Sequence, residues 1–300
     1  MLLPLLGVDR YSKNQVRGAS MATKVSLINM KGGVGKSTLT VNLAWHFASY
    51  RDWNKRVLVV DLDPQFNASQ YLLGVSEYES ILKSNKPTIW DVFEQGTRTP
   101  GGQTSLANPR APIHPHRNFH AGGKIDLIPS RLELAFSLKN PGQKERHLSR
   151  LVKEVEEDYD LVLIDCAPTE SVLTTAAYLA SDWLLVPVKP EYLSTIGLPL
   201  LVNSMEDFKS EYESKVLGLA GVVFNAASDY LPEEALAKKT VREIAKTNGW
   251  YVFKSEVDYS RSYPKGAREG QPIFRTSYSR WSKVRNFETF AEEFEERVGL

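Results

Sequence analysis

A glycine-rich segment near the start of the chain carries the residue types that bind phosphate. Residues 30–38 read MKGGVGKST, and they lie between a short apolar run and a helix-compatible run. Glycines let successive backbone N–H groups turn towards phosphate oxygens, and the helix that follows presents its positive end. Lys36 supplies a charge for the β- and γ-phosphates, and the Ser37 hydroxyl can ligate Mg²⁺. The predicted phosphate-binding residues are Gly32, Gly33, Val34, Gly35, Lys36, Ser37 and Thr38.

Three aspartates stand at the ends of apolar runs further along the chain. Asp61 and Asp63 lie at the end of the apolar run of residues 56–63, and Asp165 is the last residue of the apolar run of residues 161–165. Ligands of open α/β sheets bind at the carboxyl ends of the strands, where an acid can meet Mg²⁺ beside the phosphates. Asp165 is therefore predicted to be the acid on the metal side. For Asp61 and Asp63 a second interpretation stays open, because either could cap the helix that follows.

Short runs rich in Val, Ile and Leu alternate with helix-compatible segments along the chain. Runs that are apolar throughout suit strands covered on both faces, and the segments between them suit crossover helices. The predicted fold is α/β, a doubly wound and mostly parallel sheet with helices on both faces. The predicted strands are residues 24–29, 56–63, 124–129, 160–168, 183–188 and 217–225, and residues 250–257 can add another.

Composition excludes several classes of protein. The formal charge of +1 argues against a globally basic coat for nucleic acid. No apolar run approaches the roughly 20 residues of a membrane-spanning helix. Cys166 is the only cysteine, so an intramolecular disulfide cannot form, and no segment is typical of an export signal. These features predict a reducing, cytoplasmic location.

The phosphate-binding segment departs from the common G-x-x-x-x-G-K-[ST] pattern in an informative way. Met30 takes the place of the first glycine, and Lys31 adds a second lysine. In this form the segment resembles the deviant Walker A box of the ParA/MinD ATPases. The resemblance implies that Lys31 reaches across a dimer to the phosphates bound by the other subunit. A second cation delivered by a partner would make ATP hydrolysis depend on dimerisation.

Other segments resemble the same family in the same order. Residues 61–67, DLDPQFN, are similar to its switch I, which implies that Asp63 orients the attacking water and the hydration shell of Mg²⁺. Phe66 stands where the family usually has glycine. Asn225 matches a position that relatives place beside the adenine, although an asparagine that caps a turn is an equal alternative. The similarities cover nearly all the chain after Met21. Residues 166–169 are similar to switch II, and four further segments match in order: residues 88–93, 127–135, 186–201 and 270–274.

The resemblance carries expectations about cofactors, partners and domains. It implies ATP and Mg²⁺ as cofactors, an ATP-bound homodimer, non-specific DNA as a ligand and an activating partner of the ParB type. The resemblance is to the short partition ATPases, which lack an N-terminal helix-turn-helix domain. It implies a protein that is cytoplasmic and associates with the nucleoid. Residues 21–300 are expected to form a single P-loop ATPase domain. Residues 1–20 are expected to be a loose leader, since Pro4 interrupts an apolar run too short for a signal peptide.

The DNA-binding candidates come from an uneven distribution of charge. Residues 238–285 contain twelve Lys or Arg and four acids, a net charge of +8, within the C-terminal part where similar ATPases bind DNA. The alternative is a solvated face with bases spread around the fold. Tyr278 and Trp281 lie among the candidates, and aromatic rings are common on nucleic-acid surfaces. The candidates are Arg268, Arg275, Arg280, Lys283 and Arg285.

Competing interpretations have less support in the sequence. A membrane role is disfavoured because the polar face opposite the phenylalanine stripe of residues 287–298 is rich in glutamate, which anionic lipid would repel. One cysteine leaves no pair for an iron–sulfur carrier. The Pro- and Gly-rich residues 96–123 are expected to form a surface loop or an insertion. The histidines of this stretch, His114, His116 and His120, are more simply expected to face solvent than to bind a metal. A ParA-like switch that positions a cargo other than DNA stays open.

Overall fold

The computed structural model describes residues 21–94, 108–138, 144–191, 194–228 and 232–300. The expected leader, residues 1–20, lies outside the described residues, so its prediction is not tested. The described part contains one eight-stranded sheet in the order β3-β4-β2-β5-β1-β6-β7-β8. The strands are β1 (Thr23–Leu27), β2 (Arg56–Leu62), β3 (His114–Asn118), β4 (Lys124–Ile128), β5 (Leu161–Cys166), β6 (Trp183–Val188), β7 (Gly218–Ala227) and β8 (Val257–Asp258).

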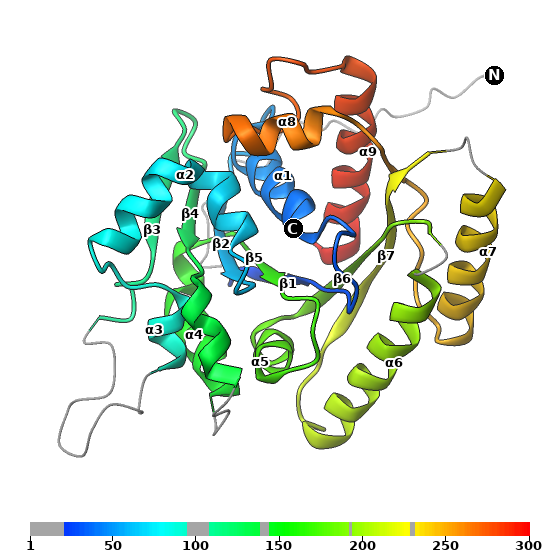
Figure 1. The fold of residues 1–300 in the computed structure, drawn as a ribbon, viewed down its shortest axis with the longest axis horizontal. Coiled ribbons are helices and arrows are strands. Elements are labelled where there is room, and N and C mark those ends of the chain that lie inside the picture. The colour runs from blue at the N-terminus through cyan, green and yellow to red at the C-terminus, as the bar shows by residue number, and fades with distance from the viewer. Residues whose placement is uncertain (1–20, 95–107, 139–143, 192–193, 229–231) are drawn as a thin grey trace, which may run out of the picture.

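The sheet lies between two layers of helices (Figure 1). One face packs against α1 (Lys36–Ser49), α2 (Asn67–Lys83), α8 (Ser262–Glu269) and α9 (Trp281–Val298). The other face packs against α3 (Ile89–Phe93), α4 (Glu145–Val155), α5 (Val172–Ala180), α6 (Ser194–Glu211) and α7 (Pro232–Thr247). Two short 3₁₀ helices, Leu132–Leu138 and Glu156–Asp158, complete the described elements. The prediction of a doubly wound α/β fold is confirmed.

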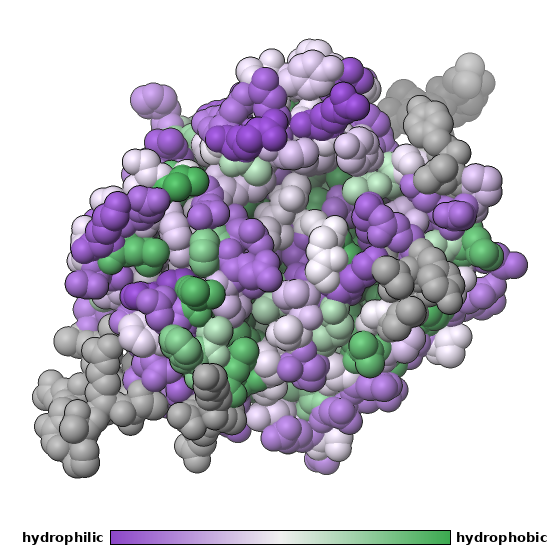
Figure 2. Space-filling view, in the orientation of Figure 1, coloured by the Kyte–Doolittle hydropathy of each residue, from purple (hydrophilic) through white to green (hydrophobic). Residues whose placement is uncertain are grey.

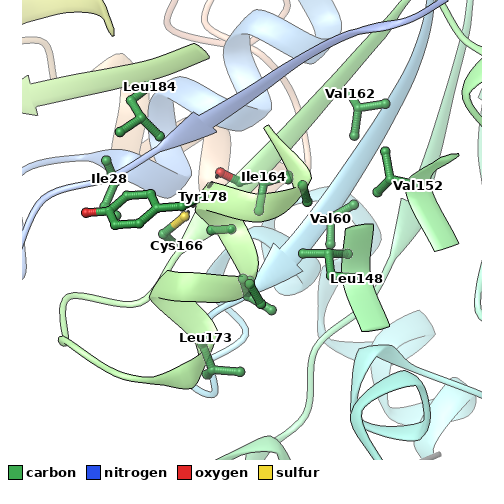
Figure 3. Close-up of a cluster of buried hydrophobic side chains, with 14 of the residues drawn as sticks. Ile28, Val60, Leu148, Val152, Val162, Ile164, Cys166, Leu173, Tyr178 and Leu184 are labelled. Atoms are coloured by element: carbon green, nitrogen blue, oxygen red, sulfur yellow. Dashed lines mark hydrogen bonds between the residues drawn. The ribbon is translucent and has the colours of Figure 1, made fainter. Parts of the chain in front are cut away.

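The core consists of two hydrophobic clusters, one on each face of the sheet. The central strands are buried along their length, as their continuous apolar runs predict. Cys166 lies in the cluster beneath β5, close to Ile28 and Tyr178 (Figure 3). Burial raises the pKa of its thiol to about 12, so Cys166 packs as a small apolar residue.

Helix α9 closes the opposite cluster, as its sequence predicts. Phe287, Phe290, Phe294 and Val298 are all buried there. The stripe therefore faces the sheet and α1 and is part of the core. None of the helices in the described ranges is long and apolar enough to cross a bilayer.

The sequence assigns residues 96–123 to a surface loop or an insertion; residues 96–107 lie outside the described residues, and the sheet corrects the expectation for part of the rest. Residues 114–118 form the edge strand β3, antiparallel to β4, with an irregularity between Pro115 and Arg117. Proline is tolerated at an edge because its missing N–H can face away from the ladder. His114 Nε2 lies 2.8 Å from the Pro87 carbonyl oxygen, and the ring of His116 meets Trp45 edge-on.

Candidate functional site

The phosphate-binding segment forms the turn between β1 and α1 that its sequence predicts. Gly35 precedes the first residue of α1 with φ 91°, a left-handed conformation that favours glycine. A Cβ atom there would overlap the Asn225 side-chain amide. Asn225 Nδ2 donates to the Val34 carbonyl oxygen at 2.7 Å, so β7 supports the turn from behind. The backbone N–H groups at the start of α1 are left to face the cavity.

Lys36 is held inside the turn by backbone carbonyls. Its Nζ atom donates to the carbonyl oxygens of Asn29 and Lys31, each at 3.1 Å, and the side chain is buried. Burial lowers the pKa of the ammonium group, and the charge of Asp165 partly opposes that effect. An anion entering the cavity would meet a cation that the fold has already oriented.

Asp61 serves the local structure, as the helix-capping alternative proposed. It accepts hydrogen bonds from the Ser69 backbone N–H at 2.7 Å and the Ser69 hydroxyl at 2.6 Å. A further bond from the Asp63 N–H, at 3.2 Å, fixes the turn between β2 and α2. Burial raises the pKa of Asp61 to about 7 despite these hydrogen bonds.

Asp165 lies opposite Asp61 on the neighbouring strand and has a different environment. It is fully buried, and neither carboxylate oxygen has a hydrogen-bond partner in the part of the chain described. Burial raises the pKa of Asp165 well above its usual range, Asp61 adds to the rise, and the nearby Ser37 and Lys36 partly offset it. Buried acceptors without donors are costly, so this carboxylate is suited to a cation.

A Mg²⁺ ion fits this arrangement. Asp165 and the nearby Ser37 hydroxyl would supply oxygen atoms for the ion, and Asp63 lines the same cavity as Ser37. Among the residues with assigned positions, no three His, Cys, Asp or Glu side chains could hold a metal together. Mg²⁺ commonly takes only one or two carboxylates and completes its shell with water and phosphate oxygens, so two acids and a hydroxyl suffice.

The turn after β2 places Asp63 at the cavity. Its Oδ1 accepts from the Gln65 N–H at 2.9 Å, and burial raises the pKa of its carboxyl group. Phe66 adopts φ 49° and ψ 31°, the left-handed conformation that the usual glycine would take. Its ring stacks on Tyr78 with centroids 5.0 Å apart, a contact that stabilises the unfavourable backbone. The turn therefore keeps a glycine-like conformation without glycine.

A cavity of about 640 Å³ lies between the phosphate-binding turn and the turn after β2. It contains six of the predicted phosphate-binding residues together with Asp63, and it extends beyond them along α2 and α8. The sequence did not predict these outer residues or the buried Asn29. The side-chain Oδ1 of Asn29 accepts a hydrogen bond from the Lys31 N–H at 2.9 Å. The only sequence signal for Asn29 is a polar residue directly after an apolar strand. The lining residues are Gly32, Gly33, Gly35, Lys36, Ser37, Thr38, Asp63, Gln65, Asn67, Gln70, Tyr71, Gly74, Val75, Pro168, Ala267 and Arg268.

Four residues predicted for the nucleotide and metal site lie outside this lining, and one of them is Asp165, which is fully buried. Val34 is buried behind the turn, and Asn225 contacts the turn rather than the cavity, so its place beside the adenine stays a prediction. Lys31 forms an ion pair with Glu191 at 3.1 Å and does not line the cavity of its own chain.

The five DNA-binding candidates fall into different environments. Arg268 lines the cavity, and the Arg275 guanidinium lies over the rings of Trp45 and Phe119. Lys283 pairs with Asp258 at 2.7 Å. Arg280 and Arg285 are exposed at the start of α9. Arg280 and Arg285 are therefore the exposed candidates that neither line the cavity nor pair with an acid among the described residues.

Fold and site together define a P-loop nucleotide-binding protein, because the glycine-rich turn, the buried Lys36 and the strand-end acid Asp63 meet at one cavity, and the buried Asp165 lies near Ser37 and Lys36. Residues 22–217 match the model of a family described as AAA domain. The chain belongs to this family and is a ParA-type ATPase within it.

The relatives and solved structures agree with this assignment. The chromosome-partitioning ATPase Soj of Treponema pallidum is 27% identical over 93% of this chain and 99% of its own length. The ATP complex of a Cyanothece McdA variant has a TM-score of 0.75 at 19% identity, covering 94% of this chain and 98% of its own. A putative plasmid partition protein of Borrelia burgdorferi, bound to AMPPNP, has a TM-score of 0.67 at 22% identity, covering 92% and 99%.

Proposed function

We propose that this ParA-type ATPase is Mg²⁺-dependent, dimerises on ATP, binds DNA without sequence preference and positions DNA cargo. The observation that carries the proposal is the meeting of Lys36, Ser37 and Asp63 at one cavity, with the buried Asp165 carboxylate close enough to Ser37 and Lys36 for both to lower its pKa. Each side chain has a distinct part in phosphoryl transfer to water.

In the proposed reaction, water attacks the γ-phosphorus while its bond to the oxygen shared with the β-phosphate breaks. The products are ADP, inorganic phosphate and a proton. Lys36 and the N–H groups of the turn bind the phosphate oxygens, and Asp63 accepts a hydrogen bond from the attacking water. Mg²⁺, held by Ser37, Asp63 and Asp165, would neutralise charge on the phosphates when bound.

Lys31 connects this chemistry to dimerisation in the proposal. Its side chain is about one-fifth exposed and does not line the nucleotide cavity of its own chain. In a dimer the Lys31 ammonium group could therefore lie beside the γ-phosphate bound by the partner chain, where it would stabilise the negative charge that develops in the transition state. A partner of the ParB type would then stimulate hydrolysis and release the dimer from the nucleoid in the cytoplasm.

The exposed start of α9 is the surface best suited to DNA. Arg280 and Arg285 have no acidic partner among the described residues, and Trp281 is 79% exposed beside them. Arg280 donates to the Tyr278 hydroxyl at 2.8 Å, which orients its guanidinium at the surface. Cations beside exposed rings suit phosphates and unstacked bases, and they carry no sequence readout by themselves.

Filter binding of unrelated DNA fragments tests the proposal over a salt series with ATP, ADP or no nucleotide. We expect equal binding of all fragments, stronger with ATP, and a fall of log K with log salt of about 0.9 per phosphate contact. ATP dependence follows because a dimer presents two such surfaces at once. Binding that ignores salt and nucleotide, or strongly prefers one sequence, would contradict DNA positioning and favour a cargo other than DNA.

A further inference from the structure

We infer that Arg268 of α8 binds the phosphate chain of the nucleotide in its own subunit, as a second cation beside Lys36. This inference rests on the proposed nucleotide site and extends it to a residue outside the phosphate-binding turn. Arg268 lines the same cavity as Gly32, Lys36 and Ser37, although it lies more than 230 positions later in the sequence.

The charges of the cavity favour an anion at this position. Three lining residues are ionisable as Lys, Arg, Asp or Glu: Lys36, Asp63 and Arg268. Lys36 is deep in the turn, and Asp63 is on the side of the predicted metal. Arg268 is therefore the cation of the outer part of the cavity, and hydrophilic side chains gather over α8 there (Figure 2).

Nearby acids do not neutralise Arg268. Its neighbour Glu269 accepts from the Ser277 N–H at 3.0 Å and the Ser277 hydroxyl at 2.6 Å, and it lies 3.7 Å from Lys265. Arg268 itself has no ion pair among the residues that the structure places. A guanidinium offers donors in a planar fork that matches phosphate oxygens, so an anionic ligand would complete its hydrogen bonding.

Close packing fixes the height of α8 over the cavity. A Cβ atom at Gly266, two residues before Arg268, would lie 2.8 Å from the Tyr71 hydroxyl and would overlap the Gln271 carbonyl oxygen. The Tyr71 hydroxyl itself donates to that carbonyl at 3.2 Å and receives a hydrogen bond from Asn42 Nδ2, also at 3.2 Å. Helices α1, α2 and α8 are thereby joined beside the cavity, and Arg268 starts from a fixed backbone position.

The test measures binding of ATP and of Mg-tripolyphosphate, which has no base or sugar, to the full chain. We expect Arg268→Ala to weaken both by the same factor, about 10- to 100-fold, as loss of a charge-assisted hydrogen bond predicts. Arg268→Lys should recover part of the loss because it restores the charge. Arg150→Ala on α4 is the matched control, since it removes an exposed arginine that does not line this cavity.

The outcomes separate this inference from the proposed function. If Arg268→Ala weakens ATP but not tripolyphosphate, the side chain contacts the nucleoside and the phosphate assignment is wrong. If both ligands bind the variant as they bind the wild type, Arg268 is not in the nucleotide site. If the wild type itself binds neither ligand, the nucleotide site of the proposed function fails first. Melting curves of each variant show whether the fold is retained.

Discussion

Lys31 Nζ lies 3.1 Å from Oε2 of Glu191, a residue of the same chain that follows β6 and precedes α6. Glu191 also pairs with Lys189, and its two lysine partners hold the pKa of its carboxyl group below the usual value. A lysine that acts on the nucleotide of a second subunit has to leave this carboxylate first. In the proposed dimer the pair would therefore oppose association, but only weakly, because exposed ion pairs contribute at most about 1 kcal/mol.

Glu191→Gln should therefore favour the ATP-bound dimer. Removing a competing contact worth at most about 1 kcal/mol from each of the two chains corresponds to no more than about a 30-fold gain in the dimerisation constant. Analytical ultracentrifugation with ATP measures the constant, and Glu154→Gln, on α4, is a matched control away from the site. A weaker dimer in Glu191→Gln would mean that Glu191 positions Lys31 for its task rather than restraining it.

Lys36→Ala should abolish detectable ATP binding. The variant removes the only lysine in the cavity lining and leaves the Asn29 and Lys31 carbonyl oxygens without their donor. Loss of a buried, hydrogen-bonded charge is expected to weaken ATP binding by at least about 30-fold. Isothermal titration calorimetry measures the change, and an unaltered dissociation constant would show that the phosphates bind elsewhere.

Asp63→Ala and Lys31→Ala should differ in their oligomeric state. Asp63→Ala leaves Lys36 and Asp165 in place but misplaces the water, so hydrolysis should fall by at least about 100-fold while the dimer accumulates with ATP. Lys31→Ala should bind nucleotide as a monomer and neither hydrolyse it nor dimerise. Light scattering with ATP separates the two. Two monomeric variants, or two that hydrolyse normally, would contradict delivery of Lys31 in trans.

The parts of the site that sequence could predict are those in which one short segment determines the geometry. Residues 30–38 fix a turn and a helix start directly after one apolar strand, and Asp165 follows from another apolar strand. The Lys31–Glu191 pair joins residues 160 positions apart, and the placement of Arg268 depends on α8 packing on α2 at Gly266. Such contacts exist only after the sheet has assembled. Strand β3 was missed because an exposed edge strand needs no apolar alternation.

His46 should make stability depend on pH. Its ring is buried among Tyr50, Phe47 and Phe287, and burial lowers the pKa to about 3, with Arg51 adding to the effect. Between pH 6.5 and about 3 the unfolded chain binds a proton there that the folded chain does not. The free energy of unfolding therefore falls as pH decreases, by up to about 1.4 kcal/mol per pH unit from this group.

Urea unfolding at pH 7.5 and pH 5.5 measures this contribution when wild type is compared with His46→Phe. The wild type should lose more stability than the variant, because the variant has no imidazole to protonate while its carboxylates titrate as before. Equal losses in the two proteins would mean that His46 is protonated without cost in the folded state.

Charge removal at Arg280 and Arg285 should weaken DNA binding without affecting ATP. Neither side chain lines the cavity, and each should account for about one released counterion. The double variant Arg280→Ala and Arg285→Ala should bind all fragments less tightly, with a salt slope smaller by about 2 per chain. Lys153→Ala with Arg150→Ala on α4 removes the same charge from the opposite face of the sheet and should leave the slope unchanged. Equal slopes in the two double variants would show that DNA responds to net charge alone and that the start of α9 is a solvated face.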